Sequence, residues 1–267
     1  MRSTYKNPLT VKQQADYLEQ NKRVIFGSVN RNDAEQYLYE HCYINVITPF
    51  KHCFAKRDPV TGVTIRDANN NHVYERDIDF SEYKNKYEGE RDSYPTIYKN
   101  IMQFESTLNS IVANEVIHSY HIDSYEKFTD FRGTLLKNAQ YASSAENVVA
   151  HLRDEINSFY YDMKRYEDIY IFIDRLSLSG TIAVWKCSDN HIKKKIFKEL
   201  MASGMTFQYT SLGTFNDFLE RIVPIRNCVC HFNSLEVLIN YYDIKNKSLR
   251  RNSDKKKYIN IIAKLSV

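Results

Sequence analysis

A six-residue stretch near the C-terminal end of the chain, Arg226 to His231, contains the side chains that phosphate chemistry needs. Cleaving RNA without a metal requires a group that takes the 2′-OH proton, a group that protonates the leaving 5′-oxygen, and a cation that stabilises the phosphorane. Histidine titrates near neutral pH, while the arginine guanidinium stays charged and matches phosphate geometry. Arg226 and His231 are therefore candidate catalytic residues, and the chemistry they indicate is metal-independent RNA cleavage.

The placement of these residues on a helix has two consequences. Pro224 suits a first helical turn, which would put Arg226 and Asn227 near a helix N-terminus, where free backbone N–H groups favour a phosphate. The five-residue step to His231 leaves the two side chains about 140° apart around a regular helix. One copy of the motif need not aim both at one phosphate, whereas two such helices facing across a two-fold axis would line a shared cleft. The spacing predicts a homodimer through these helices.

Glu105 is a further candidate for the site. It falls beside Ile101, Leu108 and Val112 on the apolar side of an expected helix, where an unpaired carboxylate is costly to bury. Two interpretations are open: the carboxylate pairs with Arg226 or a nearby base and helps set the site, or it reaches solvent at the edge of the face.

A basic run lies between residues 245 and 257, which include seven Lys or Arg and one acidic residue. Such a run either holds phosphates by charge, with a salt-sensitive affinity, or is a solvated tail segment. The candidate RNA-binding residues are Lys245, Lys247, Arg250, Arg251, Lys255, Lys256 and Lys257.

The five cysteines are spread unevenly over a large chain, which favours reduced thiols over a disulfide scaffold. Cys228, Cys230 and His231, together with Cys187 and His191, contain zinc-ligand types, but their spacings fit no standard finger. The two cysteines of the motif are expected to be small buried residues on the flanks of a packed helix. We expect no metal and no cofactor.

Composition favours helices, because seven Gly and five Pro in 267 residues are few for a loop-rich β protein. No apolar stretch approaches the roughly 18 residues that suggest a membrane span, and the N-terminus lacks the apolar segment of a signal peptide. The expected location is cytoplasmic, without membrane contact.

Local sequence patterns predict where the helices and a possible hairpin lie. Cap spacings at Thr10–Gln13 and Asn32–Glu35 predict one helix near residues 10–21 and a second that ends before Pro49. Turn signals allow a short β-hairpin near residues 60–75. Apolar periodicity predicts a long helix from about Tyr94. Further helices are expected at 124–138, 143–163, 168–177, 190–203, 212–222 and 225–242.

These elements predict a mainly α protein in three parts. A helical N-terminal lobe covers residues 1–85, and an antiparallel helical bundle that carries the motif covers residues 86–244. The basic C-terminal segment covers residues 245–267.

Several segments carry a family resemblance. Arg-Asn-x-x-x-His near the end of an all-helical chain resembles the Arg-x(4–6)-His signature of the HEPN ribonuclease superfamily. Residues 7–14 (NPLTVKQQ), Tyr37-Leu38 with Asn45, and residues 177–180 (SLSG) ahead of IRNCVCHFNSL resemble bacterial abortive-infection proteins of the AbiD/AbiF type. The similarity runs over most of the length. One departure is the stretch of residues 91–95 (RDSYP), where the family has Asp-Arg-x-Leu-Arg.

The resemblance implies a HEPN-type bundle and an endoribonuclease that acts as an anti-phage or toxin component, is dimeric, and is restrained by a small noncoding RNA. By the family pattern Arg226 binds the scissile phosphate, Asn227 orients the site and His231 transfers protons. The products would carry 2′,3′-cyclic phosphate and 5′-OH ends. An alternative is a non-catalytic HEPN module that holds a regulatory RNA on the same surface, and a third hypothesis is a zinc-stabilised interaction protein.

Overall fold

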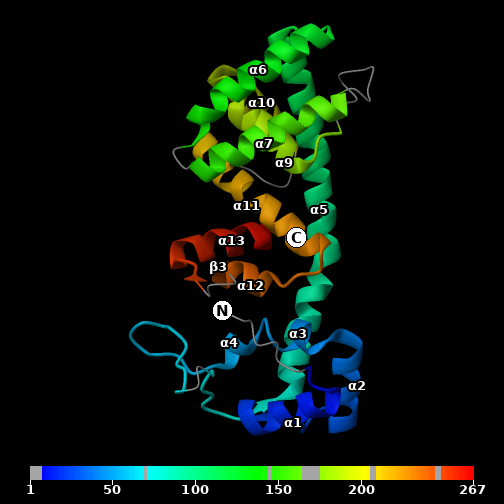
Figure 1. Cartoon of the computed structure of the whole chain (residues 1–267), viewed down its shortest axis with the longest axis vertical. Helices are drawn as coiled ribbons and strands as arrows, with labels where there is room; N and C mark the ends of the chain where they lie inside the picture. The colour runs from blue at the N-terminus through cyan, green and yellow to red at the C-terminus, as the bar shows by residue number, and fades with distance from the viewer. Residues whose placement is uncertain (1–7, 69–70, 144–145, 164–174, 205–208, 244–247) are drawn as a thin grey trace. The chain divides into compact units, whose positions relative to one another are not determined.

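The computed structural model describes residues 8–68, 71–143, 146–163, 175–204, 209–243 and 248–267. Within these ranges the chain is mainly α, as composition and periodicity predict (Figure 1). The described strands form two short pairs. β1 (Val24–Ile25) is parallel to β2 (Ile78–Asp79), and β3 (Tyr241–Asp243) is antiparallel to β4 (Ser248–Leu249).

The described residues group into two compact units, each assembled from segments that are distant in the sequence. Unit 1 falls within residues 1–95 and 227–256, and unit 2 falls within residues 96–226 and 257–267. Two helices, α5 (Phe80–Tyr120) and α11 (Leu212–Cys230), contribute residues to both units. The three-part division at residues 85 and 244 stays a prediction.

Unit 1 begins with two capped helices, followed by the short helices α3 (Tyr43–Val46) and α4 (Lys51–Phe54). α1 (Val11–Lys22) has the predicted capping box, in which Thr10 and Gln13 satisfy each other's backbone N–H groups. α2 (Arg31–His41) is capped by Asn30, whose side chain accepts a hydrogen bond from the Asp33 N–H at 3.0 Å. The predicted cap at Asn32 is therefore wrong. The spacing of a helix cap fits both Asn30 and Asn32, and the helix begins after Asn30.

The core of unit 1 forms where α1 and α2 pack together and meet the first turns of α5. Leu18, Leu38, Phe80 and Tyr83 are at most 2% exposed. Residues 55–68 and 71–74, where a hairpin was allowed, make isolated antiparallel bridges: Ala55 with Tyr74, Arg57 with Thr64, and Arg66 with His72.

Helix α5 starts earlier than the sequence predicts. It begins at Phe80 instead of near Tyr94 and continues through Pro95. Tyrosines supply the apolar stripe in its first turns, since Tyr83 and Tyr94 are at most 3% exposed among otherwise polar neighbours. A periodicity count restricted to aliphatic residues and Phe misses this stripe, because Tyr buries its ring while keeping a polar hydroxyl.

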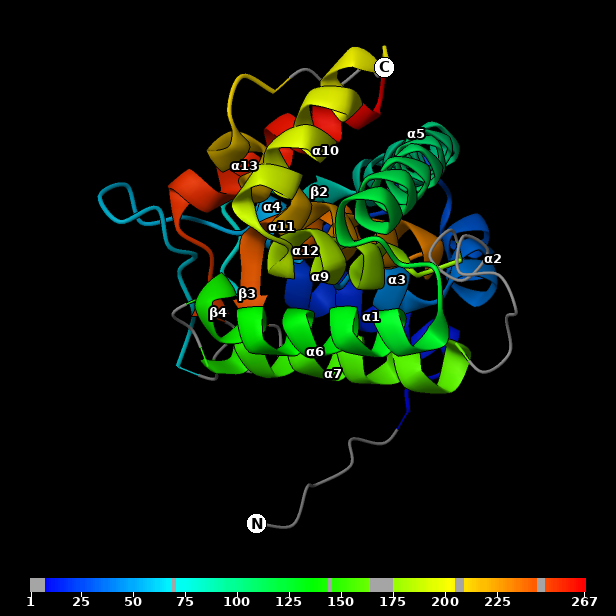
Figure 2. The same ribbon diagram turned by 90° about the horizontal axis from the view of Figure 1, so that it is seen from above.

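Unit 2 contains the predicted helices near 124–138, 143–163 and 190–203. They are α6 (Tyr125–Ala142), α7 (Glu146–Met163) and α10 (Asn190–Ala202). α6 and α7 lie side by side and both contact α9 (Leu178–Cys187), a helix the sequence analysis did not predict (Figure 2). The predicted helix at 168–177 lies largely outside the described residues.

The C-terminal segment contains a helix where only a basic segment was expected. α13 (Asn252–Leu265) buries Tyr258, Ile261 and Leu265, three residues at helical spacing that belong to unit 2. The segment is therefore more than a charged tail. Its last residues contribute to the core of unit 2.

Candidate functional site

The predicted catalytic residues lie at the end of helix α11. Arg226 and Asn227 fall in its last turns, and His231 is the first residue after it. His231 and Asn227 are exposed, and the Arg226 side chain is 34% exposed. A hydrogen-bonded core histidine, the ordinary structural explanation for a histidine next to apolar residues, is excluded by the exposure of His231.

Pro224 does not start a helix, contrary to the prediction. It lies inside α11, which joins the predicted helix at 212–222 to the first part of the one at 225–242. The rest of the latter becomes α12 (Leu235–Asn240). Backbone N–H groups inside a helix bond to carbonyls four residues earlier, so Arg226 and Asn227 do not sit at a free helix N-terminus. An anion bound here would therefore be held by side chains, not by free N–H groups of a helix start.

In unit 2, Arg226 faces the carboxylate of Glu105. Arg226 Nε lies 3.9 Å from Glu105 Oε2, while Glu105 Oε1 accepts a hydrogen bond from the backbone N–H of Leu178 at 2.9 Å. Glu105 is 8% exposed. The structure therefore brings these two predicted site residues together, and it places Glu105 at the N-terminus of α9, where a negative charge is favoured.

The segment just before α9 is held on α5 by neighbouring contacts. Asn109 Nδ2 donates to the Leu176 carbonyl at 3.0 Å, and Thr181 Oγ1 donates to Asn109 Oδ1 at 2.6 Å. Ser177 caps α9 by accepting from the Gly180 N–H at 3.1 Å. Residues 177–180, noted above for their resemblance, thus form the start of the helix that receives Glu105. Asn109 was not predicted, and only its position four residues after Glu105 on the same helix face signals its role.

In unit 1, a tight turn follows His231 and ends α11. The Asn233 N–H donates to the Cys228 carbonyl at 2.8 Å, and the Phe232 N–H donates to the Val229 carbonyl at 3.2 Å. This is the Schellman pattern, in which the residue in the left-handed conformation is usually Gly. Here it is Phe232, a residue with φ +52° that is 65% exposed. A bulky residue in this conformation is strained, which is commonest at functional sites.

Two side chains fix the carbonyl that follows this turn. The Tyr94 hydroxyl and the Cys228 thiol both donate to the Asn233 carbonyl oxygen, the thiol at 3.2 Å. Burial raises the pKa of Cys228 to about 12, so the thiol keeps its proton at neutral pH. Burial also raises the pKa of Tyr94. Cys228 is buried as predicted, whereas Cys230 is half-buried.

Glu90 anchors the start of α12. Its Oε1 accepts from the Ser234 hydroxyl at 3.1 Å and from the Glu236 N–H at 2.8 Å, and burial raises its pKa. Ser234 caps α12 by accepting from the Val237 N–H. The chain in the turn and directly after it is therefore fixed by α5.

Arg91 is a further candidate for the site, one that could not be identified from the sequence alone. Its guanidinium carbon lies 5.0–5.3 Å from the ring centroids of Tyr87, Tyr94 and Phe232. Arg91 Nε and Nη1 are buried without a hydrogen-bond partner among the described residues. The guanidinium is thus held by aromatic faces beside Phe232, the residue that follows His231. The only signal in the sequence was its position in the departure at residues 91–95.

The family model for Abi-like proteins matches residues 36–235, which is most of the chain and includes Arg226 and His231. The chain belongs to the Abi-like protein family. This membership supports a function in abortive infection. No curated protein and no solved structure matches the chain. In the described part of this Abi-like chain, none of the helices has the length and apolar character that crossing a membrane requires.

The basic run of this Abi-like chain is distributed over different environments. Lys245 and Lys247 lie outside the described residues. Arg250 Nε donates to a backbone carbonyl of α12 at 2.8 Å, and Lys257 Nζ contacts Asp217 at 2.7 Å. Arg251 and Lys256 are exposed and Lys255 is half-buried.

No metal site was expected from the sequence, but one group of side chains has the arrangement that could hold a metal ion. Among the described residues, the group of three possible ligands that lie within reach of one ion consists of His52, Cys53 and Glu236. Among the described residues, no such group is formed by the combination weighed from the sequence, which is Cys228, Cys230 and His231 with Cys187 and His191. His52 and Cys53 are adjacent in the sequence, but nothing in the sequence connects them to Glu236.

Proposed function

We propose that this Abi-like chain is a metal-independent HEPN endoribonuclease that acts as an abortive-infection or toxin component. The observation that carries the proposal is the exposure of His231 at the end of α11, five residues after an arginine that faces a buried carboxylate. An exposed imidazole on a turn fixed by α5 can reach a substrate, and its two nitrogens can accept and donate a proton.

Each residue of the motif has a proposed role. Arg226 binds the scissile phosphate, and Glu105 orients the guanidinium from the other side as a positioning residue. Asn227, exposed on the last turn of the helix, orients the substrate. His231 takes or returns a proton during attack of the 2′-OH on phosphorus, which expels the 5′-oxygen and leaves a 2′,3′-cyclic phosphate. Arg91 adds positive charge beside Phe232, and the exposed Phe232 offers a stacking surface for a base.

The proposed substrate is single-stranded RNA, and the restraining partner is a small noncoding RNA. Exposed basic side chains at Arg251 and Lys256 supply part of the phosphate-binding surface. A substrate held by such charges binds with an affinity that falls as salt concentration rises, and each lost cation reduces the slope by about one.

The test is RNA cleavage by purified wild type and His231→Ala in the presence of EDTA, with circular dichroism confirming that both remain folded. His191→Ala is the matched control, because His191 is also exposed but lies on α10. Cleavage by wild type and by the control, absent in His231→Ala and leaving cyclic phosphate ends, is expected. Equal cleavage by all three proteins would reject the mechanism.

The homodimer is part of the same proposal and has its own test. If Arg226 of one subunit works with His231 of the other, mixing inactive Arg226→Ala and inactive His231→Ala proteins restores partial cleavage, because mixed dimers contain one complete pair. Failure of the mixture to cleave, with subunit exchange demonstrated by differently sized tags, would reject the shared cleft.

The alternative is a non-catalytic module that binds a regulatory RNA through the same surface. Its support is the guanidinium of Arg91 beside the ring of the exposed Phe232, since a cation next to an aromatic face suits RNA binding without chemistry. RNA binding by wild type without cleavage under any tested condition would favour this module over the enzyme.

A further inference from the structure

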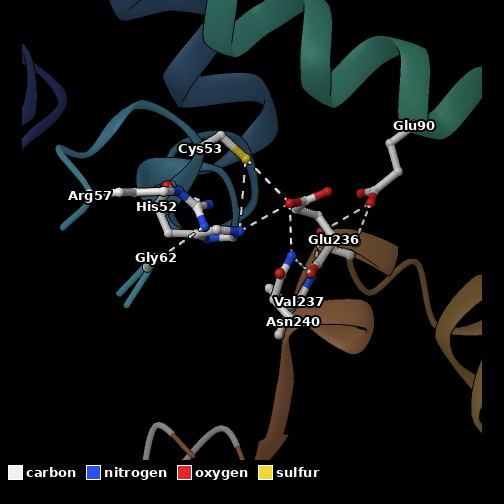
Figure 3. Close-up of polar contacts among 9 residues, drawn as sticks. His52, Cys53, Arg57, Gly62, Glu90, Glu236, Val237 and Asn240 are labelled. Atoms are coloured by element: carbon white, nitrogen blue, oxygen red, sulfur yellow. Dashed lines mark hydrogen bonds and ion pairs between the residues drawn. The ribbon is translucent and has the colours of Figure 1, made fainter. Parts of the chain in front are cut away.

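Three side chains with metal-ligating atoms converge in unit 1, and none of them belongs to the Arg-x(4)-His motif (Figure 3). His52 and Cys53 come from α4, and Glu236 comes from α12, 184 residues later in the sequence than His52. His52 Nε2 lies 3.0 Å from Glu236 Oε1, and Cys53 Sγ lies 3.3 Å from the same oxygen. The third distance, between Sγ and Nε2, is 3.8 Å.

These three distances match the edges of a tetrahedral zinc site. Zinc binds Cys sulfur at about 2.3 Å, His nitrogen at about 2.0–2.1 Å and carboxylate oxygen at about 2.0–2.2 Å. For tetrahedral angles, those bond lengths place the ligand atoms about 3.4–3.6 Å from one another. The observed separations of 3.0, 3.3 and 3.8 Å differ from this by about 0.4 Å or less, which side-chain adjustments accommodate.

The cluster is supported by its surroundings. His52 is 4% exposed, and its ring lies edge-on to Tyr241 with centroids 5.7 Å apart. Asn240 Nδ2 donates to Glu236 Oε1 at 2.8 Å, and the Glu236 N–H is held by Glu90. Metal-binding residues are characteristically oriented by such second contacts. The Glu236 side chain is 30% exposed, so the cluster borders solvent.

We infer that His52, Cys53 and Glu236 bind a zinc ion, with water in the fourth position. A neutral imidazole, a thiolate and a carboxylate carry two negative charges, which Zn²⁺ neutralises. Burial raises the pKa of the metal-free Cys53 thiol to about 12, so zinc binding releases the thiol proton to solvent. Zinc, which accepts nitrogen, sulfur and oxygen ligands together, suits this set better than magnesium or calcium, which prefer oxygen.

The ion would connect two distant parts of the chain within unit 1. α4 belongs to the N-terminal part, and α12 directly follows the turn after His231. Binding to the folded state alone stabilises it, and the stabilisation grows with the ratio of zinc concentration to Kd. The inference does not depend on the ribonuclease proposal, since the ligands are not among the proposed catalytic residues.

The experiment measures metal in the full-length protein. Purified wild type is stripped with chelator, checked for folding by circular dichroism, dialysed against zinc and analysed by elemental analysis. About one zinc per chain is expected for wild type and for Cys42→Ser, the matched control, because Cys42 is an exposed free cysteine of the same unit. Cys53→Ser and Glu236→Gln are expected to lose at least tenfold in zinc affinity.

A second measurement covers the case in which these variants fold poorly. Titration of stripped wild type with Co²⁺ is expected to give a thiolate-to-cobalt charge-transfer band that zinc abolishes and that Cys42→Ser retains. Folded wild type that binds neither ion, or zinc retained at full affinity by Cys53→Ser, would overturn the inference and leave a hydrogen-bonded cluster without metal. Neither result bears on RNA cleavage, which is measured separately with the His231→Ala protein.

Discussion

Glu105 allows the positioning of Arg226 to be tested apart from the stability of α9. One carboxylate oxygen accepts the Leu178 N–H at 2.9 Å, and the other lies 3.9 Å from Arg226 Nε. Glu105→Gln keeps an acceptor for Leu178 but removes the charge that faces Arg226. Glu105→Ala removes both. The two variants should therefore differ in their free energy of unfolding, whereas both lose the charge that is proposed to position Arg226.

The expected magnitudes follow from the burial of each partner. A buried N–H left without an acceptor costs about 1–3 kcal/mol, and truncating a buried side chain adds a cavity cost of similar size. The pair with Arg226 contributes about 1 kcal/mol at most, because its distance is long and Arg226 is partly exposed. We expect Glu105→Ala to lower the free energy of unfolding by about 3 kcal/mol and Glu105→Gln by about 1 kcal/mol or less. For a chain of this size the larger loss lowers Tm by roughly 6–12 °C.

Urea unfolding followed by circular dichroism measures both values. Glu115 offers matched controls, since it lies on the same helix and its carboxylate is also 3.9 Å from a cation, Lys195. Glu115→Gln and Glu115→Ala should each cost about 1 kcal/mol or less. The reasoning fails if Glu105→Ala is no less stable than Glu115→Ala, or if Glu105→Gln is as unstable as Glu105→Ala. Normal RNA cleavage by folded Glu105→Gln would remove the positioning role.

Three other predictions concern unit 1. Burial opposes ionisation of Asp79, but hydrogen bonds from Ser81 and Ser28 outweigh burial and lower the pKa of Asp79 to about 2. The stability that this ionised carboxylate adds is therefore present above about pH 4 and is lost as the pH falls towards 2. Asp79→Asn should flatten that part of a stability–pH curve measured by urea unfolding. Phe232→Gly should keep or raise the free energy of unfolding, because Gly relieves about 1 kcal/mol of strain at positive φ. The same variant should lose roughly tenfold in RNA affinity in a filter-binding assay, because the stacking ring is gone. Tyr94→Phe should cost about 1 kcal/mol in urea unfolding, because the Asn233 carbonyl loses a donor.

The parts of the fold that were predictable depend on local chemistry. The capping box at Thr10 and Gln13 specifies the start of α1 without help from the rest of the chain, because both partners lie within one turn. α6, α7 and α10 were also placed nearly correctly, since each has an apolar stripe at helical spacing. In these segments the local preference agrees with the tertiary structure.

The failures occur where packing overrides a local signal. Pro95 and Pro224 both lie inside long helices, although Pro removes a helical hydrogen bond. Each is followed by buried residues, Ile97 and Ile225, whose burial offsets part of that cost. A rule that ends helices at proline cannot weigh this compensation, because it depends on contacts between segments far apart in the sequence.

The residue types of the candidate site could be identified from the sequence, but the residues that contact them and hold them in place could not. Arg226, His231 and Glu105 were identified from charge, titration range and the cost of burial, and the structure pairs Glu105 with Arg226. Arg91 was not identified, because its significance depends on contact with Phe232, 141 positions later in the sequence. Similarly, the adjacent His52 and Cys53 indicate nothing until Glu236 lies beside them.

The observed end of α11 bears on whether one chain can form the proposed site. The His231 N–H still donates to the Asn227 carbonyl at 3.1 Å, a helical four-residue step, so the backbone leaves the helix only at Phe232. The rotation of about 140° expected between Arg226 and His231 on a regular helix therefore applies to their backbone positions here. The proposal that Arg226 of one copy works with His231 of another therefore keeps its basis in the helical spacing, and mixing the two inactive variants tests it.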